Sequence, residues 1–144
     1  ESDVYSFGVI MTEMTTGKPP FCNTTHDEKL AEEICMGLRP EINKSITPPN
    51  YFQLAKRCLD ADPTKRPTFD KLHDTLEFWH DALSERGLLP NEEKTKVIRE
   101  SFEPFDKIQI ESSYTPREGV FYIRRTLGLG QFSKPENYKD HYIY

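Results

Sequence analysis

The apolar segment DVYSFGVIMTEM, residues 3–14, constrains the fold of this chain more than any other feature of its sequence. GKPP follows it, and glycine and proline both interrupt helices, so the pattern predicts a helix over residues 3–16. Ser2 or Asp3 is its expected N-cap. The apolar residues cover far more than one helical stripe, and a helix that is apolar nearly all round belongs in a core. We therefore expect an interior helix that other segments cover.

Three further helices are predicted from their start signals and their spacing. THDE at residues 25–28 is a capping box that starts the second helix, and Pro48 with Pro49 opens the third. Thr68 caps the fourth helix, whose apolar residues recur at spacings of 3, 4, 3 and 4. This spacing places Trp79 in the core.

The helical periodicity ends after residue 89. Residues 90–144 are interrupted by prolines and lack a sustained apolar pattern, although residues 94–102 favour a brief helix. We therefore expect a mainly α fold. Four helices form a domain over residues 1–89, and residues 90–144 form a poorly ordered, largely irregular C-terminal tail.

Composition argues against several classes of function. The formal net charge is −5, and no segment is strongly basic, so we expect no nucleic-acid partner. No run approaches 18 apolar residues, so we expect no membrane span. The 3 cysteines are odd in number and form no CxxC pair, which argues against both a disulfide framework and a zinc site. A reducing, cytoplasmic location fits this pattern best.

Three segments resemble, in order and spacing, the lower half of the C-terminal lobe of a eukaryotic protein kinase. SDVYSFGVIMTEMTTGKPPF is similar to the buried helix αF, and HDEKLAEEICMGLRPEI is similar to αG. YFQLAKRCLDADPTKRPTFDKL resembles αH, the D-P-x-x-R-P loop and αI. The forms SDVYSFGV and CLDADPTKRPT are typical of the tyrosine-kinase-like branch of Ser/Thr kinases. Because αF is the central post of that lobe, the resemblance implies that further kinase sequence precedes residue 1.

The motifs that carry phosphoryl transfer in that family are not found in the sequence. A VAIK-type lysine, H-R-D-x-x-x-x-N, D-F-G and A-P-E are all missing. LGLGQFS at residues 127–133 imitates a glycine-rich phosphate loop, but no lysine strand follows it, so we interpret it as tail. We therefore expect no catalytic, cofactor-binding or metal-binding residue in this chain, which alone should be inactive. The resemblance assigns ATP and magnesium to the parent kinase.

Three residues match family positions with structural roles. Asp3 matches the αF aspartate that accepts hydrogen bonds from the catalytic loop, although for this chain alone a helix cap is the favoured interpretation. Arg66 matches the arginine that pairs with the glutamate of A-P-E, and the alternative is a solvated loop residue. Glu13 matches a position that helps some relatives to bind basic substrate side chains, and the alternative is a polar residue facing the next helix.

Two functions from different classes follow. The first is a partial kinase domain whose parent transfers the γ-phosphoryl group of ATP to Ser/Thr and presents the αG region to a protein substrate or regulator. The second is a non-catalytic interaction module derived from a kinase, which is a pseudokinase-like remnant. It would bind a partner through the face of the αF-like helix that no other segment covers. The first is favoured because each apolar side chain of the first helix left in water forfeits about 1.5–3 kcal/mol. The side chains expected to lose cover are Val4, Phe7, Ile10, Met11 and Met14.

Overall fold

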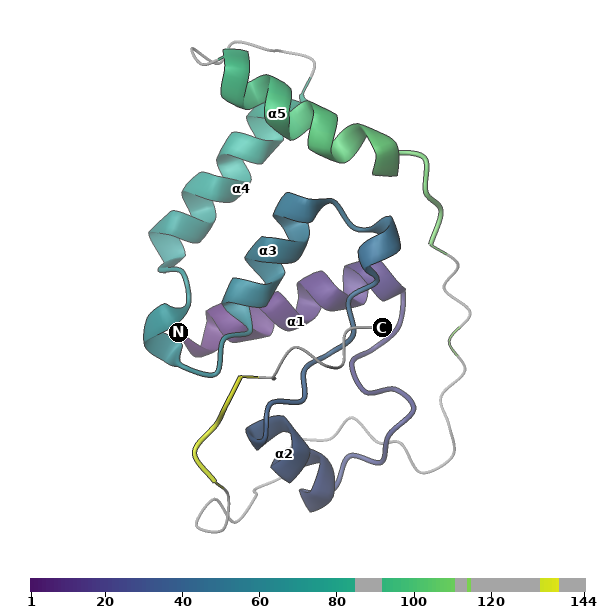
Figure 1. The fold of residues 1–144 in the computed structure, drawn as a ribbon, viewed down its shortest axis with the longest axis vertical. Helices are drawn as coiled ribbons and strands as arrows, with labels where there is room; N and C mark the ends of the chain where they lie inside the picture. The colour runs from purple at the N-terminus through teal and green to yellow at the C-terminus, as the bar shows by residue number, and fades with distance from the viewer. Residues whose placement is uncertain (85–91, 111–113, 115–132, 138–144) are drawn as a thin grey trace.

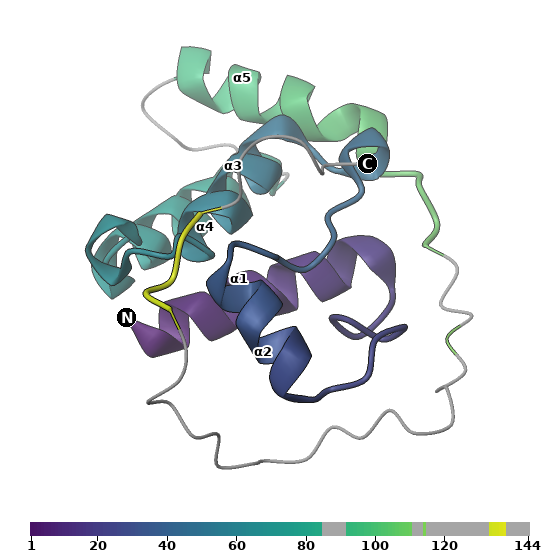
Figure 2. The same ribbon diagram turned by 60° about the horizontal axis from the view of Figure 1, so that its bottom comes forward.

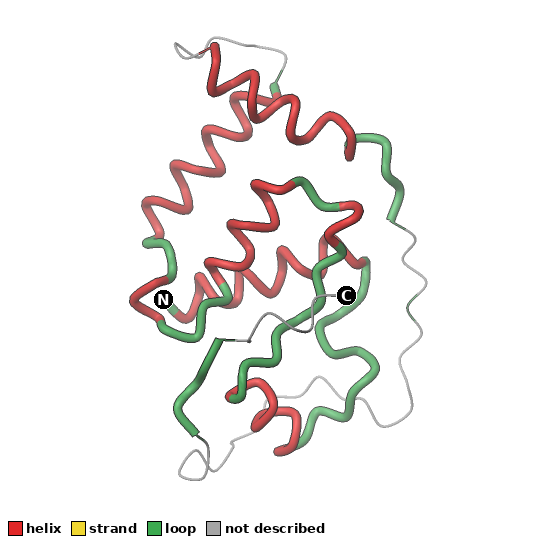
Figure 3. Tube along the Cα trace, viewed as in Figure 1, coloured by secondary structure: helices red, strands yellow, loops and turns green. Residues whose placement is uncertain are grey.

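The computed structural model describes residues 1–84, 92–110, 114 and 133–137. In these parts of the chain the regular structure is entirely helical, which confirms the expected mainly α class (Figure 1, Figure 3). The α-helices are α1 (Ser2–Thr16), α2 (Glu28–Cys35), α3 (Pro49–Cys58), α4 (Phe69–Leu83) and α5 (Glu92–Phe102). Three short 3₁₀ helices are η1 (Lys44–Ile46), η2 (Pro63–Lys65) and η3 (Glu103–Phe105). None of the described helices is both long enough and apolar enough to cross a bilayer.

Helix α1 ends as predicted but begins differently. Gly17 adopts a left-handed conformation (φ 64°), and its N–H donates to the Glu13 carbonyl at 2.8 Å. At the other end Glu1 is the N-cap and makes no side-chain cap hydrogen bond. Ser2 and Asp3 lie within the first turn, so the predicted capping role of either residue is wrong. The Asp3 carboxylate still complements the helix dipole from that turn.

The starts of the other predicted helices follow local signals, with one correction. Asp27, rather than Thr25, caps α2, since its carboxylate accepts from the Leu30 N–H at 3.1 Å. Pro49 occupies the first turn of α3, and the Thr68 hydroxyl accepts from the Lys71 N–H at 3.3 Å at the start of α4, as predicted. These caps fix where each helix enters the fold.

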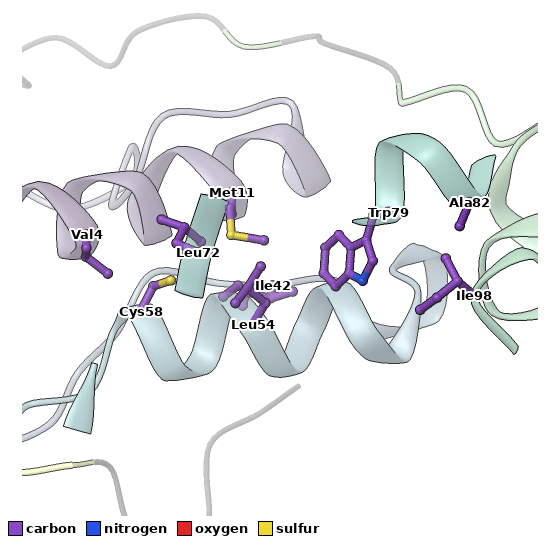
Figure 4. Packing of buried hydrophobic residues seen from close by; sticks show 10 residues of the cluster. Val4, Met11, Ile42, Leu54, Cys58, Leu72, Trp79, Ala82 and Ile98 are labelled. Carbon is purple, nitrogen blue, oxygen red and sulfur yellow. The ribbon is translucent and has the colours of Figure 1, made fainter. Parts of the chain in front are cut away.

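Helices α1 and α3 pack closely at a glycine. Gly8 is buried, and a Cβ atom added there would lie 2.8 Å from Cys58 Cβ and 3.0 Å from Leu59 Cγ. Glycine thus allows the two helix backbones to approach more closely than any other residue would. Around this contact, Figure 4 shows Val4 and Met11 of α1 pointing towards α3, where Cys58 and Leu54 lie on the facing surface.

The apolar surface of α1 is only partly covered. Val4 and Met11 are buried in the core, whereas Ile10 is 53% exposed and Met14 is 65% exposed. The expected loss of cover is therefore seen at Ile10 and Met14 but not at Val4 or Met11. The helix packs along α3 on one face and leaves a two-residue apolar strip, Ile10 and Met14, on another.

Trp79 lies in the core, as its spacing predicts. The indole of Trp79 stacks near Tyr51 of α3 with ring centroids 6.4 Å apart, and meets Phe102 of α5 edge-on at 5.4 Å. These contacts join α4 to α3 and α5. Figure 4 shows Trp79 within the cluster of buried apolar side chains. The three cysteines are free, and Cys22 and Cys58 are buried.

Helix α5 extends the ordered core beyond the expected domain edge. It begins before the short helix predicted from residue 94, and Ile98 is buried in the same core as Ala82. The Arg99 Nε–H donates to the Ala82 carbonyl at 2.6 Å. The helix is two residues longer at its start than the brief helix predicted over residues 94–102, and the aromatic end of α4 supplies the surface on which it packs. Most of LGLGQFS lies outside the described residues.

Because of the Tyr51 hydroxyl, we expect the free energy of unfolding to fall at alkaline pH. It donates to the Met11 carbonyl at 3.0 Å, and burial raises its pKa from 10.0 to about 12. Because the folded state holds the proton more tightly, this contribution is complete below pH 10 and is lost as the pH rises towards 12. Over that window the free energy of unfolding should fall by about 1–2 kcal/mol more in the native chain than in Tyr51→Phe. Denaturant titrations across the window measure it, and parallel curves for the two proteins would contradict it.

Candidate functional site

The D-P-x-x-R-P loop between α3 and α4 is the best-defined candidate site. The Asp62 carboxylate accepts from the Thr64 hydroxyl at 2.7 Å and from the Thr64 N–H at 3.0 Å, which closes the turn that becomes η2. These hydrogen bonds hold the pKa of Asp62 below its usual value. Arg66 follows this turn, and its side chain lies beside the start of α1.

Arg66 ties this loop to the first turn of α1 through neutral partners. Its Nε–H donates to the Asp60 carbonyl at 2.8 Å, while Nη1 and Nη2 donate to the carbonyls of Glu1 at 3.2 Å and Ala61 at 3.5 Å. The guanidinium also lies over the Tyr5 ring, 4.9 Å from its centroid. No carboxylate within the described ranges pairs with it. The positive charge is thus positioned without an ion pair from the described residues, which leaves its outer face able to pair with an acidic group.

The other two matched residues lie apart from one another on α1. Asp3 is exposed in the first turn, near the loop of Arg66, and no hydrogen bond from the described part of the chain reaches its carboxylate. Glu13 is exposed near the C-terminal end, about 15 Å along the axis at 1.5 Å per residue. The structure therefore places Asp3 and Arg66 at the same end of α1 and leaves Glu13 at the other. The roles that the resemblance assigns to these residues stay predictions.

Sequence reasoning missed a second arginine that organises the far end of α2. The Arg39 Nε–H donates to the Leu59 carbonyl at 2.9 Å, and Nη1 donates to the carbonyls of Ile34 at 2.9 Å and Leu38 at 2.8 Å. Nη2 donates to the Glu136 carbonyl at 3.1 Å. One guanidinium thus joins α2, the end of α3 and a segment near the C-terminus. Every residue has a backbone carbonyl, so no sequence pattern identifies the ones that Arg39 binds. The only signal in the sequence was the position of Arg39 between Gly37 and Pro40, which follow the helix.

The described residues do not fit ATP or magnesium. Holding the nucleotide and its metal requires a lysine on the phosphates and converging carboxylates on the ion. Among the described residues every buried polar or charged residue is a threonine. The one group of potential metal ligands that the structure brings together there is His73, Asp74 and Glu77, which are all exposed on α4. No step of phosphoryl transfer can be built from these residues.

Arg66 itself yields a stability prediction. Arg66→Ala removes three hydrogen bonds and the stacking on Tyr5, so we expect the free energy of unfolding to fall by about 1–2 kcal/mol. Arg66→Lys should recover only part of this loss, since an ammonium group cannot reproduce the planar fork. Urea titrations measure the change, with the exposed Lys71→Ala as the control. An effect of Arg66→Ala no larger than that of Lys71→Ala would contradict the anchoring role.

The fold and this loop define the class of protein as the helical part of a kinase C-terminal lobe. The model of the family "protein tyrosine and serine/threonine kinase" matches residues 1–76, which include α1, α2, α3, the Arg66 loop and half of α4. The match covers more than half of the 144 residues. The chain belongs to the protein tyrosine and serine/threonine kinase family.

Individual relatives agree with this assignment. The chain is 39% identical over 83 residues to the probable serine/threonine-protein kinase roco5 of Dictyostelium discoideum, covering 53% of this chain and 3% of that protein. It is 38% identical over 71 residues to the dual specificity mitogen-activated protein kinase kinase mek-1 of Caenorhabditis elegans, covering 49% and 20%. It is 36% identical over 80 residues to the human scaffold protein ILK, covering 56% and 18%.

The chain therefore spans between 3% and 20% of the lengths of these three relatives. No solved structure matches it.

Proposed function

We propose that residues 1–89 form the lower part of the C-terminal lobe of a protein kinase that transfers the γ-phosphoryl group of ATP to Ser/Thr residues. The match of the kinase family over residues 1–76 carries this proposal. In this role α1 is the central post of the lobe, and the exposed strip of Ile10 and Met14 packs against further kinase sequence. The 144 residues alone do not catalyse the transfer, because the motifs that hold nucleotide and metal are missing from them.

Arg66 supports the same proposal. Its guanidinium is held in place by carbonyls and stacked on Tyr5, with no acidic partner among the described residues. In the parent kinase this arginine pairs with the glutamate of the A-P-E motif. Losing one partner of a buried pair costs about 3–5 kcal/mol. Arg66→Ala should therefore destabilise a chain that contains A-P-E more than it destabilises residues 1–144.

The partner-binding part of the proposal concerns α2, which corresponds to αG. Its outward residues are mostly charged, and Met36 at its end is 58% exposed. This helix presents a surface to a protein substrate or regulator of the kinase. The proposed location is the cytoplasm, where ATP and reduced cysteines coexist.

A non-catalytic interaction module is the second candidate, and one finding favours it. The human relative that is 36% identical over 80 residues is named a scaffold protein. On this alternative the strip of Ile10 and Met14 binds a separate protein rather than the remainder of a kinase domain.

One pair of experiments separates the two functions. The transcript sequence preceding residue 1 is determined first. On the proposed function it encodes H-R-D, D-F-G and A-P-E in frame, and the protein translated from it phosphorylates a generic Ser/Thr substrate. Replacing the H-R-D aspartate by asparagine abolishes that activity. An in-frame start directly before residue 1 would favour the interaction module instead.

The isolated chain provides the complementary test. Purified residues 1–144 should transfer no phosphate from magnesium-ATP, and the nucleotide should not raise their Tm, because a ligand stabilises a protein only by binding its folded state. Phosphoryl transfer by this chain, abolished on heating, would contradict the proposed inactivity.

A further inference from the structure

A short segment near the C-terminus lies against the surface formed by the end of α2 and the loop after α3. The segment is SKPEN, residues 133–137, and its described residues are exposed. Figures 1 and 2 show it in yellow beside α2 and near the loop that leads into α4. It is more than 70 residues away in sequence from each of the groups that it contacts.

Glu136 binds this surface through its main chain. Its N–H donates to the Cys35 carbonyl at 2.8 Å, and its carbonyl accepts from Arg39 Nη2 at 3.1 Å. The Cys35 carbonyl lies at the end of α2, where helix carbonyls lack partners within the helix. Arg39 is held in place by its three other hydrogen bonds to main-chain carbonyls. The Cys35 carbonyl and the Arg39 guanidinium are therefore held in place by contacts that do not involve Glu136.

Asn137 binds through its side chain, and this contact requires an amide. Its Oδ1 accepts from the Ala61 N–H at 2.8 Å, while its Nδ2 donates to Asp60 Oδ1 at 2.9 Å. The asparagine amide carries an acceptor and a donor on adjacent atoms, so one side chain satisfies both partners at once. Asp60 is itself oriented by a hydrogen bond from the Asp62 N–H at 2.9 Å.

These four hydrogen bonds use different groups of the segment. The segment offers a main-chain donor and acceptor at Glu136 and a side-chain amide at Asn137, each opposite a complementary group.

The geometry points to a peptide-docking site, formed by Cys35, Arg39, Asp60 and Ala61, whose occupant is this chain's own segment 133–137 acting as a reversible latch. The contacts of the Asn137 amide make the site selective for the sequence of the bound segment. The two main-chain hydrogen bonds of Glu136 fix the direction in which the segment runs across the site. Because the contacts are few and exposed, the latch opens without unfolding the core. The site stands whether or not the parent protein is a kinase, since none of its contacts involves phosphoryl transfer.

Proteolysis of the full chain tests the latch. Glutamyl endopeptidase cleaves after Glu136, and a docked segment resists cleavage. Asn137→Ala removes two hydrogen bonds, so the Glu136–Asn137 position should be cut about tenfold faster than in the native chain. Asn137→Asp should behave similarly near neutral pH, because its carboxylate faces that of Asp60. Ser133→Ala, in the same exposed segment, is the matched control and should leave the rate unchanged.

Amide hydrogen exchange gives a readout that does not depend on the protease. The Ala61 N–H should exchange about tenfold faster in Asn137→Ala, while the Tm stays that of the native chain. A synthetic SKPEN peptide added to Asn137→Ala should slow exchange at Ala61 again, and the same peptide ending in alanine should not. Equal cleavage and equal Ala61 exchange in the native chain and Asn137→Ala would overturn the latch. Failure of the peptide to slow exchange would overturn the docking site.

Discussion

Replacing Trp79 by alanine should lower the free energy of unfolding by about 3–5 kcal/mol, the largest effect that we expect from a single side chain. Trp79 is buried and lies between Tyr51 of α3 and Phe102 of α5. Alanine removes both ring contacts and leaves a cavity where three helices meet. Since small domains are typically stable by about 5–15 kcal/mol, such a loss is a large share of the total stability.

The measurement is urea unfolding followed by far-UV circular dichroism, because the mutation removes the chain's single tryptophan. Trp79→Phe keeps a ring between the same neighbours and should lose markedly less. Phe69→Ala, on the same helix, is the matched control because Phe69 is 72% exposed, and it should change the stability by no more than about 0.5 kcal/mol. Equal losses in Trp79→Ala and Phe69→Ala would contradict the packing described here.

Replacing Gly8 by alanine should destabilise the protein by about 1–3 kcal/mol. In an exposed helix the same change normally stabilises by up to about 1 kcal/mol, because alanine is the better helix former. Here the new methyl group would lie 2.8 Å from Cys58 Cβ and 3.0 Å from Leu59 Cγ. The Cys58 Cβ is tied to the α3 backbone, so the two helices must move apart. The steric effect therefore reverses the sign that helix propensity alone predicts.

Thermal and urea unfolding of Gly8→Ala test this reversal. Ser6→Ala is the control, since Ser6 is exposed on the same helix and its hydroxyl donates to the Ser2 carbonyl one turn earlier. We expect Ser6→Ala to be neutral or slightly stabilising. A rise in stability for Gly8→Ala would show that α1 and α3 are not in close contact at this point.

Much of the fold follows from local signals in the sequence. Gly17 ends α1 and Thr68 starts α4 because turn and cap chemistry depends on a few neighbouring residues. The start of α1 was not predictable in this way. Its first turn is met by Arg66 from a distant loop, which donates to the Glu1 carbonyl, and the capping signal of Ser2 and Asp3 is not used.

In the C-terminal part of the chain, too, local sequence signals predict only part of the structure. Residues 94–102 carry a weak helical pattern, supported by the exposed pair of Lys96 and Glu100 at 3.6 Å. What stabilises α5 is its packing on Ala82 and Trp79, and that surface exists only after α4 has folded. Pattern reasoning therefore found a helix here but placed it outside the domain.

The candidate site was predicted in part. A motif located Arg66, because its loop has a characteristic order of aspartate, proline and arginine. The groups that bind its guanidinium are main-chain carbonyls and the ring of Tyr5, and neither has a sequence pattern that identifies it. Arg39 was missed for the same reason, although it organises the surface on which residues 133–137 lie.

The position of α5 has a consequence for how the protein opens. Ile98 and Phe102 cover the end of α4, so α4 cannot expose its last turns while α5 stays in place. The two helices should then share one opening free energy and belong to a single cooperative unit. A sequence change that weakens α5 is thereby transmitted to residues of α4 that precede it by about 20 positions.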